Sequence, residues 1–258
     1  MNLPLAHGSR TSGLGGRTPR YQGPLKVEET SLRAILRETH RGNLEPSQLS
    51  LLDRGMKPDA VDGLPIFYAG DLNLLKRPAV SVIGTRNVSE IGRKRAMRIA
   101  RELVEAGVVV VSGLAEGVDT HALTSALRNG GSVVAVIGTP LDKAYPASNA
   151  RLQEEIYDRH LLISQFPAGE RTFPSSFPAR NRTMAALSDA SVIIEASESS
   201  GTLHQAAECV RLGRWLGISK GVVEDPRLTW PAKFKSYEKC VVLESTEELL
   251  HKIYGSAA

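Results

Sequence analysis

A chain of 258 residues can bury one large α/β core, or such a core with a small appendage. With 41% hydrophobic and 23% charged residues, the composition is that of an ordinary soluble globular protein, and no apolar run approaches the ~20 residues needed to cross a bilayer. The net charge of +4 permits polyanion binding without establishing it, and the two cysteines, in no metal-ligand spacing, indicate a reduced cytoplasmic protein with no zinc site.

Two short segments are expected before the main domain. Residues 1–22 contain several glycines, three arginines and no acidic residue, which predicts a flexible basic tail. Such a tail could add loose contact with nucleic acid, or it could simply be a disordered end. A weakly amphipathic stretch around Leu32 predicts a short helical N-terminal segment over residues 23–63. The main domain is expected over residues 64–258.

From Pro78 onward, short apolar runs alternate with segments of helical spacing. Apolar runs rich in β-branched residues are typical of strands that are covered on both faces, and strand–helix alternation predicts a doubly wound, mostly parallel α/β sheet with helices on both faces. A last helix is expected over Thr246–Tyr254, capped by Ser245 with Glu248 completing a capping box. The predicted strands are Ala79–Gly84, Val108–Ser112, Ser132–Gly138, Leu161–Gln165, Ser191–Ala196, Trp215–Ser219 and Cys240–Leu243.

In open parallel sheets, ligands bind at the carboxyl ends of the strands, so the loops after the strands are the candidate site. The first strand is followed by Gly84, Thr85 and Arg86, and Ser89 can cap the next helix. Glycine lets a ligand approach the backbone, the threonine hydroxyl can donate, and the guanidinium can bind a phosphate in a bidentate manner. A tight turn with a solvated arginine explains the same residues equally well.

Two further loops carry glycine and hydroxyl side chains. After the second strand, Ser112, Gly113 and Gly117 suit a backbone nest for an anion, although the alternative is a simple turn in which Asp119 is a scaffold. After the fifth strand, three residues open a helix whose free N–H groups suit a phosphate oxygen, although ordinary capping also explains them. These three residues are Ser200, Gly201 and Thr202.

The stretch from Phe177 to Arg182 carries the strongest signal. Pro178 is expected in the first turn of a helix, where Arg180 and Arg182 would oppose the helix dipole unless a phosphate is bound. Phe177 could stack on a base, and Asn181 completes the candidate set. The competing explanations are salt bridges to Asp189 or Glu195 and a phenylalanine in the core. We expect Arg86, Arg180 and Arg182 to face a common cleft.

The sequence contains no recognisable catalytic set. His121 and His204 lie in predicted helices without an obvious nucleophile, and neither a dinucleotide fingerprint nor a P-loop is present. We therefore expect no enzymatic activity, no cofactor and no metal.

Five motifs occur together in the chain. They are Gly84-Thr85-Arg86, Ser112-Gly113-Leu114-Ala115 with Gly117 and Asp119, Tyr145-Pro146 with Asn149, Phe177-Pro178 with Arg180-Asn181-Arg182, and Ser200-Gly201-Thr202-Leu203. In this order and spacing they resemble the DprA/Smf DNA-processing family, over roughly residues 64–221 and the closing strand and helix. The resemblance implies an extended Rossmann-like fold, single-stranded DNA binding in which Arg86 and the stretch 177–182 contact the strand, homodimerisation, and loading of RecA during natural transformation.

The sequence also departs from the family pattern. Glu116, Ala147 and Pro174 stand where relatives often carry basic residues, and His121 falls two places earlier than the usual histidine. With no winged helix expected after the Rossmann-like domain, the chain resembles a divergent, short member.

Two other functions are compatible with such loops. The first is N-glycoside hydrolysis of nucleoside monophosphates, as in the related phosphoribohydrolases, but Gln205 stands where those enzymes carry a carboxylate and cannot supply acid/base chemistry. The second is a sensor domain, for example in phage defence, that binds a small nucleotide.

Overall fold

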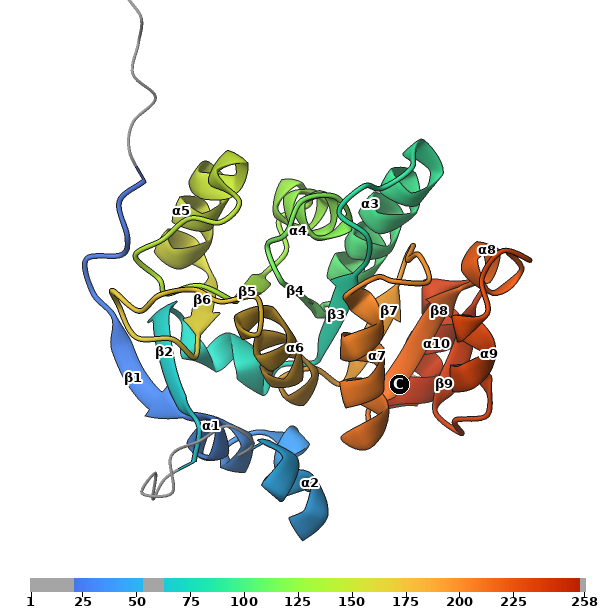
Figure 1. The fold of residues 1–258 in the computed structure, drawn as a ribbon, viewed down its shortest axis with the longest axis horizontal. Helices are drawn as coiled ribbons and strands as arrows, with labels where there is room; N and C mark the ends of the chain where they lie inside the picture. Colours follow the sequence, from blue (N-terminus) through green and yellow to red (C-terminus); the bar gives the residue numbers. More distant parts are fainter. Residues whose placement is uncertain (1–20, 53–62, 256–258) are drawn as a thin grey trace, which may run out of the picture.

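The computed structural model describes residues 21–52 and 63–255, which form one central sheet with helices on both faces (Figure 1). Within these residues the sheet has nine strands in the order β1-β2-β6-β5-β4-β3-β7-β8-β9. Strands β3 to β9 are parallel to one another, whereas β1 pairs with β2, and β2 with β6, in the antiparallel sense. The strands are β1 Glu28–Ser31, β2 Pro65–Gly70, β3 Ala79–Ile83, β4 Val109–Ser112, β5 Val133–Ile137, β6 Leu161–Ser164, β7 Ala190–Ile193, β8 Trp215–Ser219 and β9 Cys240–Leu243.

The predicted doubly wound α/β sheet is confirmed, and each strand predicted from Pro78 onward is present. The bounds agree within one residue, except that β7 ends at Ile193 and not at Ala196. Strands β3, β4, β5, β6 and β7 are buried along their whole length, which explains why they consist of almost continuous apolar runs.

The helices divide between the two faces of the sheet. One hydrophobic core joins one face to α3, α4, α5 and α10, and a second core joins the other face to α1, α2, α6, α7, α8 and α9. The α-helices are α1 Leu32–Arg37, α2 Pro46–Leu52, α3 Glu90–Glu105, α4 Val118–Arg128, α5 Ala150–Arg159, α6 Ser176–Ala186, α7 Thr202–Arg211, α8 Lys220–Val223, α9 Trp230–Lys235 and α10 Thr246–Tyr254. Short 3₁₀ turns are η1 His40–Gly42, η2 Leu72–Lys76 and η3 Ala147–Asn149.

Both predicted serine caps are present. The Ser89 hydroxyl accepts from the Gly92 N–H at 3.0 Å, and the Ser245 hydroxyl accepts from the Glu248 N–H at 3.1 Å. The Glu248 carboxylate pairs with Lys252 at 3.6 Å, so the cap of α10 is formed by the serine side of the predicted box.

The order of the strands creates a point where the winding of the sheet reverses. From β3 the chain moves outward through β4 and β5 to β6, and it then returns to place β7 on the other side of β3. Loops that leave β3 and β7 therefore diverge at the carboxyl edge of the sheet, where α/β proteins bind ligands.

The N-terminal segment contributes a strand that the sequence did not predict. Strand β1 pairs with β2, so residues of the segment 23–63 extend the sheet of the main domain, and the boundary between the two stays a prediction. The predicted tail lies outside the described residues except for its last two. Tyr21 donates to the Leu141 carbonyl at 2.8 Å, and the Gln22 carbonyl accepts from the Tyr157 hydroxyl at 3.0 Å. These two residues are therefore fixed to the domain.

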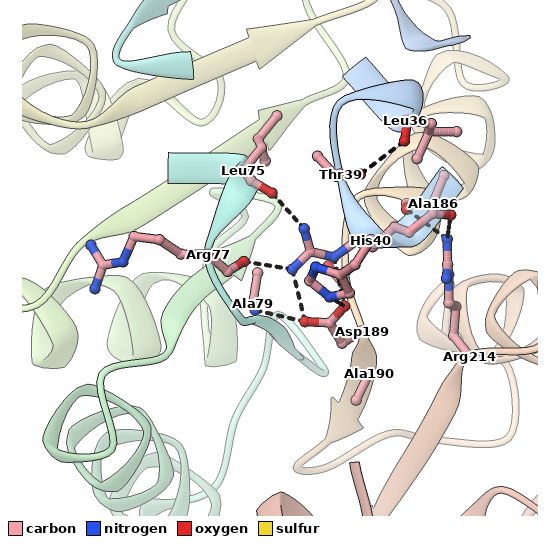
Figure 2. Close-up of polar contacts among 12 residues, drawn as sticks. Leu36, Thr39, His40, Leu75, Arg77, Ala79, Ala186, Asp189, Ala190 and Arg214 are labelled. Atoms are coloured by element: carbon pink, nitrogen blue, oxygen red, sulfur yellow. Dashed lines mark hydrogen bonds and ion pairs between the residues drawn. The ribbon is translucent and has the colours of Figure 1, made fainter. Parts of the chain in front are cut away.

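A buried ionic cluster ties the N-terminal segment to the amino edge of the sheet (Figure 2). Arg41, 1% exposed, pairs with Asp189 at 2.7 Å and donates to the Leu75 carbonyl at 2.5 Å. The Asp189 carboxylate also contacts His40 Nε2 at 2.7 Å and accepts from the backbone N–H of Ala79 at 2.9 Å. Burial raises the pKa of Asp189, but Arg41 and the hydrogen bonds outweigh it, so that the net shift is downward.

The hydroxyl of Tyr254, at the end of α10, donates to the same Asp189 carboxylate at 2.7 Å. One side chain thus joins the N-terminal segment, the first residues of β3 and β7, and the last described helix. Across residues 21–52 and 63–255, every helix is too short or too polar to span a lipid bilayer.

Candidate nucleic-acid interface

A cavity of about 320 Å³ lies at the carboxyl ends of β3 and β7, where the winding of the sheet reverses. Its walls come from the β3–α3 loop, the start of α4, one face of α6, and the β7–α7 loop with the start of α7. The lining residues are Ile83, Gly84, Thr85, Arg86, Ala115, Asp119, Phe177, Arg180, Asn181, Met184, Ser197, Ser200, Gly201, Thr202 and Gln205.

The β3–α3 loop lines the cavity as predicted. A Cβ atom at Gly84 would lie 2.5 Å from a Val118 methyl group, so only glycine fits this turn. The Thr85 N–H donates to the Glu195 carbonyl at 2.7 Å, which fixes the loop against β7. The Thr85 hydroxyl accepts from the Asn87 N–H at 3.2 Å, and its own hydrogen has no acceptor in the part of the chain that the structure describes. This hydroxyl can therefore donate to a ligand.

Arg86 is exposed at the mouth of the cavity. Its guanidinium lies 5.6 Å from the centre of the Phe177 ring and 6.0 Å from the centre of the Tyr145 ring. Within residues 21–52 and 63–255 no carboxylate pairs with it. The two rings restrict where the guanidinium can lie and leave its N–H groups available to an anion.

Arg180 reaches the cavity from α6, although in a different position from the one expected. The helix begins at Ser176, so that Pro178 is in the first turn as predicted, but Arg180 falls in the second turn, past the strongest field of the helix dipole. Its side chain is 7% exposed, and Nη1 donates to the Val136 carbonyl at 2.8 Å. Its Nε is buried without a hydrogen-bond partner in the described structure. Burial lowers the pKa of Arg180, and the nearby Arg86 charge adds to this effect, whereas Asp119 opposes it.

The β4–α4 loop lies next to the cavity, and its hydroxyl and N–H groups are hydrogen-bonded within the chain itself. The Ser112 hydroxyl donates to the Val82 carbonyl at 2.7 Å, and the N–H groups of Gly113 and Ala115 donate to Asp119 at 3.0 and 3.4 Å. The nest predicted for a phosphate thus holds a carboxylate of the chain itself. Burial raises the pKa of Asp119, opposed by the Arg180 charge and these N–H groups, which fits the scaffold role considered for it.

Glycine is required in this loop for packing. A Cβ atom at Gly113 would lie 1.6 Å from Arg180 Nη1. At Gly117, φ is +75°, and a Cβ atom would lie 2.3 Å from the Thr85 carbonyl oxygen. Ser112, Gly113 and Gly117, all predicted to bind phosphate, are absent from the cavity lining and act through the residues that they position.

The other residues of α6 divide between the cavity and the helix packing. Phe177 is half-buried and lines the cavity, and the Asn181 amide donates to the Gly201 carbonyl at 3.3 Å, joining α6 to the β7–α7 loop. Arg182 does not belong to the lining and pairs with Glu208 of α7 at 3.8 Å. The expected cleft shared by three arginines therefore contains Arg86 and Arg180, and the ion-pair partners differ from the Asp189 and Glu195 that the sequence suggested.

The β7–α7 loop supplies further polar groups to the cavity lining. The Ser200 hydroxyl donates to the Thr202 hydroxyl at 2.9 Å and accepts from the Thr202 N–H at 3.2 Å, so it closes a turn at the start of α7, whose N-cap is Gly201. A Cβ atom at Gly201 would meet nothing within 4 Å, which leaves open space above the first turn of the helix. All three predicted residues of this loop line the cavity.

Sequence reasoning missed two features of the site. The sequence indicates Tyr145 only as part of the Tyr145-Pro146 motif, yet its ring lies 5.5 Å from that of Phe177 beside the cavity. For Gln205 the sequence indicates only that an amide replaces the carboxylate of the phosphoribohydrolases. In the amide orientation that satisfies its neighbours, it donates to the Asn181 carbonyl at 2.6 Å and accepts from the Ser191 hydroxyl at 3.1 Å, so it holds α6, α7 and β7 together. Among the described residues, no group of three or more His, Cys, Asp or Glu side chains could hold a metal ion.

Comparison with known proteins agrees with this architecture. The sequence model of the family described as DNA recombination-mediator protein A matches residues 56–253. The chain belongs to this family. DNA processing protein DprA of Streptococcus pneumoniae strain R6 is 44% identical over 160 residues, which cover 62% of this chain and 56% of that protein. The chain thus spans about half the length of this curated relative.

Solved structures of family members have the same extended Rossmann-like fold. The X-ray structure of Streptococcus pneumoniae DprA matches with a TM-score of 0.70 and 33% identity, over 89% of this chain and 75% of that one. A structure of Helicobacter pylori DprA, described as revealing its single-stranded DNA binding mode, matches with a TM-score of 0.66 and 27% identity, over 74% of this chain and 88% of that one.

Proposed function

We propose that this member of the recombination-mediator family binds single-stranded DNA at the cavity between β3 and β7 and catalyses no reaction there. The observation that carries the proposal is the convergence of Arg86 and Arg180 on one cavity, whose described lining residues include no exposed carboxylate. Bringing two guanidinium groups together is unfavourable unless a third charge compensates them, and Asp119 beneath Arg180 supplies one negative charge for two positive ones. A phosphate would restore the balance.

The walls of the cavity suit one phosphate group of a strand. Arg86 lies at the mouth, the Thr85 hydroxyl can donate from the β3–α3 loop, and the Ser200–Thr202 turn adds the start of α7 to the lining. The donors come from the β3–α3 and β7–α7 loops, at the point where sheets of this class bind ligands. The Helicobacter pylori relative, which is described as a single-stranded DNA binder, supports the choice of strand over other phosphate ligands.

The test is a salt titration of oligo-dT binding to the wild type and to Arg86→Ala. For a single strand, log affinity should fall with log salt with a slope of about −0.7 for each phosphate contact, so Arg86→Ala should make the slope shallower by about 0.7. At one salt concentration, loss of a charged hydrogen bond of about 1.5–3 kcal/mol should weaken binding by about 10- to 150-fold.

Arg159→Ala is the matched control, because Arg159 is also an exposed arginine, with 72% side-chain exposure, but ends α5 just before the first residue of β6, at the opposite edge of the sheet. It should leave both the affinity and the slope unchanged. Wild-type protein that does not bind oligo-dT at low salt, or equal losses in Arg86→Ala and Arg159→Ala, would overturn the proposal.

A small nucleotide is the second candidate ligand, because a cavity of about 320 Å³ falls at the lower end of the range of about 300–1,000 Å³ for small-ligand sites. A thermal-shift series with nucleoside monophosphates, triphosphates and oligo-dT separates the two ligands. Stabilisation by oligo-dT alone supports strand binding, and stabilisation by nucleotides alone favours the sensor function.

Glycoside hydrolysis receives little support from the residues of the cavity. The position of the catalytic carboxylate is filled by Gln205, which is 1% exposed and engaged with Ser191 and the backbone of α6. The carboxylate among the lining residues is Asp119, which already accepts two backbone hydrogen bonds. Neither side chain is placed to donate a proton to a departing base.

We further propose that the chain forms homodimers and assists RecA during natural transformation or homologous recombination, in the cytoplasm where the strand and the recombinase meet. Membership in a family of recombination mediators supports this role. Sedimentation analysis at several protein concentrations tests the dimer, and acceleration of RecA filament formation on oligo-dT tests the loading role. A constant monomer mass, or unchanged filament kinetics, would contradict the respective statement.

A further inference from the structure

An exposed aromatic ring stands beside the cavity. Tyr145 lies between β5 and η3 and is 48% exposed. Its ring is 5.5 Å from that of Phe177, at an angle of 44° between the ring planes, and 6.0 Å from the Arg86 guanidinium. Because Phe177 and Arg86 both line the cavity, Tyr145 lies at its rim.

The loop that carries Tyr145 is held on both sides. Before it, the Lys143 carbonyl accepts from the Gln153 amide at 3.1 Å. After it, the buried Asn149 amide donates to the Leu114 carbonyl at 2.9 Å and to the Thr120 hydroxyl at 2.8 Å. The ring is therefore presented by a fixed loop, and a ligand that contacts it does not have to order the backbone first.

Fold stability does not explain the exposure of this ring. Buried aromatic residues contribute by removing apolar surface from water, but about half of Tyr145 remains accessible, and within residues 21–52 and 63–255 its hydroxyl has no hydrogen-bond partner. Its described ring contacts are with Arg86 and Phe177, two residues that the proposed strand would touch.

We infer that Tyr145 stacks on the nucleobase next to the phosphate held by Arg86 and thereby makes the site selective for strands with unpaired bases. This inference rests on the proposed function. A phosphate and the adjacent base belong to one nucleotide unit, and Arg86 contacts both the Tyr145 ring and the cavity, so one residue sets the distance between the two subsites. Stacking on an aromatic ring accepts any base, whereas the bases of a duplex are covered by their neighbours.

The experiment compares two strands of equal length, oligo-dT and an abasic deoxyribose-phosphate oligomer, at one salt concentration. The wild type should bind oligo-dT more tightly by about 5- to 150-fold for one stacked base, which is ~1–3 kcal/mol converted at 1.4 kcal/mol per tenfold. Tyr145→Ala should lose this preference by weakening oligo-dT binding alone, and Tyr145→Phe should keep it. Arg86→Ala should weaken the binding of both strands.

Equal binding of oligo-dT and abasic strand by the wild type, or equal losses on both strands in Tyr145→Ala, would overturn the stacking role while leaving phosphate binding intact. Failure of the proposed function gives a different result, because the wild type would then bind neither strand. Tyr145→Trp provides a second readout that does not depend on the alanine variant: its added fluorescence should be quenched by oligo-dT and not by the abasic strand. Quenching by both strands, or by neither, would also refute the inference.

Discussion

Gly113→Ala should displace Arg180 from the cavity although the substitution adds only a methyl group. The new Cβ atom would lie 1.6 Å from Arg180 Nη1 and 2.4 Å from its Cζ, and the side chain is 7% exposed, so the guanidinium has no room to adjust in place. The displaced group loses its hydrogen bond to the Val136 carbonyl and leaves Asp119 without its charge partner.

Two effects contribute to the cost of this displacement. Loss of a hydrogen bond from a charged group costs about 1.5–3 kcal/mol, and the buried Asp119 carboxylate loses the Arg180 charge that opposes the effect of its burial. We therefore expect Gly113→Ala to lower the free energy of unfolding by about 3 kcal/mol, the upper end of that range. At about 2–4 °C for each kcal/mol in a chain of this size, the melting temperature should fall by roughly 6–12 °C.

Urea unfolding of a double-mutant cycle checks this reasoning. In the Arg180→Ala background the guanidinium is gone, so adding Gly113→Ala should cost less than about 0.5 kcal/mol, and the two substitutions should be strongly non-additive. Gly201→Ala is the matched control, because a Cβ atom there meets nothing within 4 Å, and its stability should equal that of the wild type. Additive effects of the two substitutions would show that the clash with Arg180 is not the cause.

Three further results are expected. Asp189→Asn leaves the buried Arg41 without its counter-charge and should lower the free energy of unfolding by about 3–5 kcal/mol, measured by urea titration. Because the pKa of Asp189 is lowered in the folded state, the stability that this carboxylate contributes is present at neutral pH and is lost on acidification. The difference in free energy of unfolding between wild type and Asp189→Asn should therefore shrink below about pH 4. A difference that grows on acidification would contradict this reasoning. Gly201→Ala should bind oligo-dT more weakly at unchanged stability, since the methyl group enters the space above α7, and unchanged binding would exclude that space from the site.

The parallel part of the fold could be predicted from the sequence because its strands are buried on both faces. Val133–Ile137 and its neighbours consist of almost continuous apolar runs, which are typical of strands covered on both faces. The β1 edge of the sheet carries no such signal. Strand β1, Glu28–Ser31, is polar, its first two residues are exposed, and it pairs with β2, from which α1, η1 and α2 separate it in the chain. A short polar strand of this kind depends on its pairing in the finished fold.

The site was predictable where one loop acts alone and unpredictable where two distant residues meet. Gly84, Thr85 and Arg86 follow a recognisable strand and reach the cavity as expected. Asp119 fills the β4–α4 nest by accepting from the N–H groups of Gly113 and Ala115, and the Arg180 charge that acts on its carboxylate comes from α6. No local pattern in the sequence specifies that approach of α6 to the β4–α4 loop.

The residues that line the cavity come from both halves of the sheet. The first of them in the sequence is Ile83 and the last is Gln205. Unfolding either half would dismantle the walls, so occupancy of the cavity is coupled to the integrity of the whole domain. A ligand held there at 100 times its dissociation constant would add about 2.7 kcal/mol to the free energy of unfolding. The domain would then resist heat and proteolysis most while its ligand is bound, and the amount of intact protein would increase with the concentration of that ligand.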